Sequence, residues 1–249
     1  MNYNPYAPPQ APPGPPALGG GVSAWTASQA ISIAWERFKD VWAPLVGATV
    51  VLFFLALAMG QVPTALGLFM PDFARSALRV PFAFAWALVQ WALGAFLDVG
   101  FTRMLLAAAR GGTPALGTLF SGGDRFLPAF ACALLRALAV SAGFVLLILP
   151  GVILALGLAF AMFFVIDAGL GPIEAMQASW QVTRGQKPEV FVLVLLALLV
   201  SLAGLSMCCV GIVGAYPLCM LAFAVAFTRI SGRKPSDAPQ PPGFGSPSL

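Results

Sequence analysis

The chain has 249 residues, of which 59% are hydrophobic and only 9% are charged. A soluble globular protein carries roughly 25% charged residues, so most of this chain cannot face water and we expect lipid to be its solvent. This composition excludes a soluble enzyme, a nucleic-acid-binding protein and a secreted disulfide scaffold, and the net charge of +4 is expected to set membrane topology rather than to bind nucleic acid.

Proline-rich tails flank the apolar part of the chain. Residues 1–22 contain seven prolines and no basic residue, unlike a cleaved signal peptide. Residues 234–249 have a similar composition, and neither segment has enough apolar surface to fold. We expect two disordered tails around a membrane domain over 23–233. Spaced prolines can also dock in aromatic grooves, so the tails are candidate sites for a protein partner, although a solvated tail is the commoner case.

Apolar runs predict six transmembrane helices arranged as three hairpins. The first two spans are expected over 41–60 and 79–103. The blocks 127–168 and 189–230 are each 42 residues long, which is enough for two crossings of about 20 residues each. Four or five long helices are the alternative. The fold class is therefore all-α, a polytopic membrane protein.

Each 42-residue block needs a turn near its middle. In the first block the turn is expected at 149–152, where proline followed by glycine favours a type II turn. In the second block the glycines within 209–214 offer a less certain turn. Gly211, Gly214 and Pro217 are also candidates for a break in the last helix, because discontinuous helices line binding sites in transporters. A packing kink is the commoner explanation.

Basic residues predict the orientation of the spans. Positive charge is retained on the cytoplasmic side of short loops. With a cytoplasmic N-terminus, only Arg75 and Arg79 face outside, and both termini are cytoplasmic; in a bacterium this would be the inner membrane. The residues expected inside are Arg37, Lys39, Arg103, Arg110, Arg125, Arg184, Lys187, Arg229, Arg233 and Lys234.

A segment with helical amphipathic spacing precedes each hairpin. Residues 27–42 place their large apolar side chains on one face, as in a helix that lies on a membrane surface. Residues 172–184 repeat the pattern, and the third case, 114–126, is weaker because two adjacent glycines interrupt it. We therefore expect cytoplasmic interfacial helices. The apolar face of the first is formed by Ile31, Trp35, Phe38 and Trp42.

The segment 172–184 also carries a set of polar and capping residues. Its proline suits a first helical position, and a glycine at its end suits a cap. The serine has no histidine in the chain to activate it, so capping and headgroup contacts are expected rather than nucleophilic catalysis. The residues of this interfacial motif are Pro172, Glu174, Ser179, Trp180, Arg184 and Gly185.

Residues 149–191, together with 100–126, resemble a family of multi-pass membrane proteins of unknown function. This family is similar to the membrane domain of some glycerophosphodiester phosphodiesterases and to YciC-like inner-membrane proteins. The resemblance covers roughly 24–232 and implies a membrane fold without a known chemistry, since no phosphodiesterase domain is present. The matching features are Pro150-Gly151, Asp167, the start at 171–175, Ser179-Trp180 and Thr183-Arg184-Gly185.

Arg136 is the charged residue expected deepest in the membrane. It lies about 14 Å into the third span, where a charge costs roughly 2.5–3.5 kcal/mol. Asp98 and Asp167 are expected near the same depth, so Arg136 can pair with either of them or with both. An ion pair that fixes helix register is the commoner outcome, and a polar pathway or ligand site is the functional alternative.

Metal and cofactor sites are not expected. The chain has no histidine, and its four cysteines lie within apolar runs without a metal-binding spacing. We therefore expect a non-enzymatic integral membrane protein. The first hypothesis is a scaffold or regulator of an envelope process that acts through the tails, and the second is a carrier for a small molecule or lipid that uses Arg136, Asp98 and Asp167. An enzyme ranks third.

Overall fold

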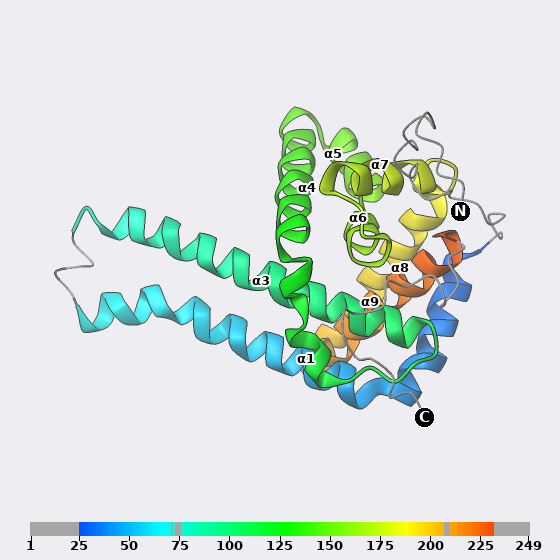
Figure 1. Cartoon of the computed structure of the whole chain (residues 1–249), viewed down its shortest axis with the longest axis horizontal. Coiled ribbons are helices and arrows are strands. Elements are labelled where there is room, and N and C mark those ends of the chain that lie inside the picture. Colours follow the sequence, from blue (N-terminus) through cyan, green and yellow to red (C-terminus); the bar gives the residue numbers. More distant parts are fainter. Residues whose placement is uncertain (1–24, 71, 73–75, 207–209, 232–249) are drawn as a thin grey trace, which may run out of the picture.

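The computed structural model describes residues 25–70, 72, 76–206 and 210–231, and within them it is all-α (Figure 1). Six helical segments there are long and apolar enough to cross a membrane, which confirms the predicted number of spans. The chain is therefore a multi-pass membrane protein. The segments are α1 (Ala27–Phe69), α3 (Arg79–Ala109), α4 (Phe126–Leu146), Ile148–Ala168, which begins with α5 (Ile148–Gly157), α8 (Lys187–Ser206) and α9 (Val210–Ser231).

Several sequence predictions fall outside these described residues. They concern both proline-rich tails, 1–22 and 234–249, and the outside charge Arg75. The cytoplasmic charges Arg233 and Lys234 also lie beyond the described part of the chain.

α1 combines the first predicted interfacial segment and the first span, joined at a kink. Thr26 caps the helix by accepting a hydrogen bond from the N–H of Gln29. Val41 then leaves helical geometry, with φ −125° and ψ 22°. Pro44 follows three residues later, and its ring clashes with the carbonyl one turn earlier and lacks an N–H, so the helix bends. The kink lies at the predicted end of the interfacial segment.

Small side chains are buried along the first half of α1. They are Ala27, Ala30 and Ala34, and small residues of this kind allow neighbouring helices to approach closely. α1 as a whole packs against α9 and α8. Trp35 and Trp42 lie on another face and are 48% and 57% exposed. Such exposed rings suit the level of the lipid headgroups.

The segment 114–126 is not the amphipathic helix that its sequence predicts. It forms two short 3₁₀ turns, η1 (Leu116–Phe120) and η2 (Gly122–Asp124). The turns fold back on α3, where a Cβ added at Gly100 would overlap the carbonyl of Leu119. Glycines therefore promote a close loop contact here instead of helical continuity.

The α4–α5 hairpin turns earlier than predicted. Leu147 alone is extended, with φ −167° and ψ 153°, between α4 and α5. Pro150 and Gly151 lie in the first turn of α5 rather than in a type II turn. Proline is tolerated there because the first N–H groups of a helix lack helical acceptors. Gly151 serves packing, since a Cβ at Gly143 would lie 2.9 Å from its Cα.

The α8–α9 hairpin is likewise closed by glycines. A Cβ at Gly211 would overlap the carbonyl of Gly204, so the two helices touch through their backbones. Gly211, Gly214 and Pro217 all lie within α9, which is helical from Val210 to Ser231. These residues do not interrupt the helix, in contrast to the predicted break.

The hairpins diverge from a shared base. Figure 1 shows the α1–α3 hairpin projecting to the left, the α4–α5 hairpin pointing upward, and α7 (Pro172–Thr183), α8 and α9 gathered on the right. Aromatic side chains hold this base together, with ring centroids 5.0–6.3 Å apart. They are Phe160, Phe163, Phe164 and Phe227.

Candidate functional site

Asp98 lies on α3, about 16 Å before the helix ends at 1.5 Å per residue, and it borders two cavities. The larger, of about 530 Å³, lies among α1, α3, α8 and α9. The smaller, of about 340 Å³, lies among α3, α4 and the segment Ile148–Ala168. Helices surround the carboxylate, but its side chain remains accessible from the cavities. Asp98 is thus the residue common to both spaces.

The larger cavity has apolar walls and a few polar groups. Its volume falls in the range of small-molecule sites, roughly 300–1,000 Å³. Ser201 lines it but donates its hydroxyl hydrogen to the carbonyl of Ala197 at 2.8 Å. Gln90, Asp98 and Tyr216 also line it, and their side chains make no hydrogen bond within the described residues. These three groups are therefore available to a ligand.

Tyr216 is held in place by an aromatic neighbour. Its ring stacks on Phe101 of α3, with centroids 5.9 Å apart and an interplanar angle of 16°. The phenol is also near enough to interact electrostatically with Asp98. The stacking fixes a hydroxyl group on the wall of the larger cavity beside the carboxylate.

Arg136 reaches the smaller cavity from α4. It faces the same space as Asp98 and is the charged group that acts on that carboxylate. In the part of the chain that the structure describes, the two side chains form no ion pair within 4.0 Å. The structure thus brings two of the three predicted residues to one cavity but leaves them out of contact.

Asp167 belongs to a different site. It lies on the π-turn η3 (Phe164–Ala168), is 3% exposed, and accepts a hydrogen bond from Arg110 at 2.5 Å. The end of α3 therefore supplies its arginine. From its sequence Arg110 was expected only to set membrane topology, because no local pattern shows that α3 ends against η3.

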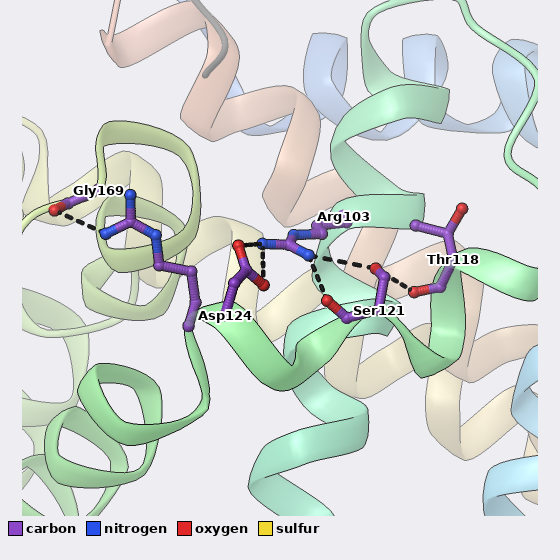
Figure 2. A network of polar contacts seen from close by, with 6 residues as sticks. Arg103, Thr118, Ser121, Asp124 and Gly169 are labelled. Atoms are coloured by element: carbon purple, nitrogen blue, oxygen red, sulfur yellow. Dashed lines mark hydrogen bonds and ion pairs between the residues drawn. The ribbon is translucent and has the colours of Figure 1, made fainter. Parts of the chain in front are cut away.

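Further arginines fix the loops on this side of the molecule. Arg103 donates two hydrogen bonds to Asp124, at 2.6 and 2.8 Å, and one to the carbonyl of Ser121 (Figure 2). Burial raises the pKa of Asp124, but the hydrogen bonds and charge of Arg103 outweigh this effect and lower the pKa overall. Arg125 donates to the carbonyl of Gly169 at 3.1 Å. These contacts hold η1, η2 and η3 in place.

Ser179 and Thr183 stabilise an irregular backbone next to α5. Ser179 is fully buried, donates to the carbonyl of Gly157 at 2.8 Å and accepts from the N–H of Phe160 at 3.2 Å. Thr183 also donates to the Gly157 carbonyl, at 3.3 Å. Both side chains form hydrogen bonds with backbone groups where the segment Ile148–Ala168 leaves helical geometry. Such groups need a protein partner because lipid offers them none. Ser179 and Thr183 therefore bond the backbone next to α5, and no side chain among the described residues caps the N-terminus of α7.

The other residues of the interfacial motif surround α7. Pro172 occupies its first turn, and the Glu174 carboxylate lies beside the backbone at the N-terminus of the helix. Trp180 packs on α5, while Arg184 is exposed. Gly185 does not provide a left-handed cap, because only Gly111 and Gly169 have positive φ among the described glycines.

The described residues contain no cluster of three or more His, Cys, Asp or Glu side chains that could hold a metal ion. Comparison of the chain with protein-family models, with curated proteins and with solved structures finds no match. The resemblance to the phosphodiesterase-linked and YciC-like membrane proteins therefore stays a prediction.

Proposed function

We propose that this multi-pass membrane protein is a non-enzymatic carrier for a small molecule or lipid, which it binds at Asp98. The observation that supports the proposal is the position of this carboxylate, which borders both the 530 Å³ and the 340 Å³ cavities. The scaffold hypothesis depends on the tails, which lie outside the described residues, so no contact described above favours it over the carrier.

The two cavities offer different chemistry to one ligand. The apolar walls of the larger cavity suit an apolar body, and Gln90 and Tyr216 can orient a polar group beside Asp98. Arg136 adds a positive charge across the smaller cavity. Intramembrane charges that do not contact each other remain available for a ligand, and such residues commonly mark substrate paths. The substrate we propose therefore has an apolar body and a polar or charged head.

The proposed orientation places both termini in the cytoplasm, in a bacterial inner membrane. The described basic residues support it, because Arg103, Arg110 and Arg125 cluster around the loops at one end of the spans. Arg79 begins α3, at the opposite end of that helix. This asymmetry follows the rule that positive loops stay inside.

The test is mass spectrometry of small molecules and lipids retained by the full-length protein after gentle purification from native membranes. Gly94 lines the larger cavity and an added Cβ meets no atom within 4 Å, so Gly94→Leu should place apolar volume in the cavity. Gly60→Leu is the matched control, because Gly60 is also open but lines neither cavity.

A carrier should retain a compound that is lost in Asp98→Asn and Gly94→Leu and kept in Gly60→Leu. Deletion of 1–22 and 234–249 should leave that compound bound. If no compound depends on Asp98 or Gly94, and a stoichiometric protein partner disappears with the tails, the carrier proposal is wrong and the scaffold hypothesis replaces it.

A further inference from the structure

A third cavity lies between α7 and the α4–α5 hairpin, apart from the Asp98 site. It is an open groove of about 760 Å³. Leu135 and Leu138 of α4 and Leu154 of α5 form its apolar floor, while Met176 and Trp180 of α7 form one wall. Leu138 is 60% exposed, so the groove is open to its surroundings.

Positive charge gathers at one end of this groove. Arg184 lines it and is exposed. Lys187 places its ammonium 4.0 Å from the centroid of the Trp180 ring. Neither side chain forms an ion pair within the described residues. The next acid along the chain, Glu189, instead accepts a hydrogen bond from the N–H of Ala27 at 2.9 Å.

The apolar surface beside the groove suits the acyl chains of a lipid. Beyond Ala139, the hairpin continues for about 12 Å to Leu147 at 1.5 Å per residue. From Phe144 onward its side chains are exposed and apolar, and those at its end are 69–86% exposed. They are Val145, Leu146, Leu147, Ile148 and Leu149.

We propose that this groove binds one anionic phospholipid. The phosphate lies at Arg184 and Lys187, and the acyl chains run over Leu138 and Leu154 toward the tip of the α4–α5 hairpin. Two cations without carboxylate partners above an apolar floor complement a negative headgroup on apolar chains. The site is separate from the carrier cavities and does not depend on their function.

The test is native mass spectrometry of the full-length, delipidated protein titrated with phosphatidylglycerol or phosphatidylcholine. A basic residue near a membrane surface changes anionic-lipid affinity by about fivefold. Arg184→Gln should therefore weaken phosphatidylglycerol binding about fivefold, and Arg184→Gln with Lys187→Gln about 30-fold. Lys39→Gln is the matched control, since Lys39 is an exposed cation that pairs with Glu36 away from the groove, and it should change binding less than about twofold.

A second variant tests the apolar part of the site. Ala139 lines the groove, and Ala139→Phe should fill it and weaken binding of phosphatidylglycerol without changing charge. The proposal is overturned if the wild type binds both lipids equally, if the double variant binds like the wild type, or if inorganic phosphate displaces the lipid completely. A change of oligomeric state in Ala139→Phe without loss of lipid would instead identify a subunit interface.

Discussion

Replacing Ser179 by alanine should destabilise the protein by about 1–3 kcal/mol, the cost of leaving a buried polar group unsatisfied. The Ser179 hydroxyl is fully buried and bridges two backbone groups, the carbonyl of Gly157 and the N–H of Phe160. After the substitution the Thr183 hydroxyl remains 3.3 Å from the Gly157 carbonyl, but its single hydrogen has a closer acceptor in the Ser179 carbonyl, at 2.8 Å. The Gly157 carbonyl therefore loses its shortest hydrogen bond, and the Phe160 N–H loses its acceptor. Alanine brings no acceptor, and lipid or packed protein offers none.

The free energy of unfolding in mixed micelles, measured by titration with a denaturing detergent, is the assay. Ser206→Ala is the control, because the Ser206 hydroxyl donates to the carbonyl of Ala203 in its own helix and its loss should change stability by less than about 0.5 kcal/mol. The reasoning is refuted if the two variants are equally stable. Thr183→Val combined with Ser179→Ala should be non-additive, since both hydroxyls share one carbonyl.

Three further predictions concern charges and backbone conformation. Arg110→Leu should lower the free energy of unfolding by about 3–5 kcal/mol, because it breaks the ion pair of the buried Asp167. Arg136→Leu should fold with nearly wild-type stability, and thermal melting of the two variants tests this difference. Asp124 has a lowered pKa, so its contribution to stability is present at pH values above its unfolded pKa of 3.8 and is lost as the pH falls through its folded pKa. The free energies of unfolding of the wild type and Asp124→Asn should therefore differ by less than about 1 kcal/mol at pH 7, and by still less at pH 3. Gly111→Ala should cost about 1–2 kcal/mol by the same unfolding assay, because Gly111 has φ +86°.

Local sequence patterns were sufficient to predict the spans. A run of about 20 consecutive apolar residues is long enough to cross the hydrocarbon core as a helix, so each span can be predicted without knowing its neighbours. The division of α1 at Val41 was also predictable, because an amphipathic pattern ends there and Pro44 follows. Turn positions were less predictable: in the α4–α5 hairpin the turn is fixed by contact between Gly143 and Gly151, a tertiary interaction that no local pattern contains.

The positions of Asp98, Arg136 and Asp167 were only partly predictable from the sequence. The sequence predicted Asp98 and Arg136 near the same depth and able to pair; in the described structure they line one cavity but form no ion pair within 4.0 Å. Their depth is readable because both lie on long helices whose rise per residue is fixed. Depth along a helix failed for Asp167, since the segment Ile148–Ala168 leaves helical geometry after Gly157 and ends in a π-turn. Extra residues in a turn rotate every later side chain, and Asp167 thereby meets Arg110.

The contrast between the two arginine–aspartate sets bears on their roles. Arg110 and Asp167 contact each other and are 14% and 3% exposed, so their opposite charges are paired inside the fold. Asp98 and Arg136 face one cavity without touching. When two opposite charges are in contact, their attraction stabilises the fold. When they are held apart in a low-dielectric region, each can still interact strongly with a charged or polar ligand that binds between them. The separated pair is therefore the one suited to a ligand, and the contacting pair the one suited to stability.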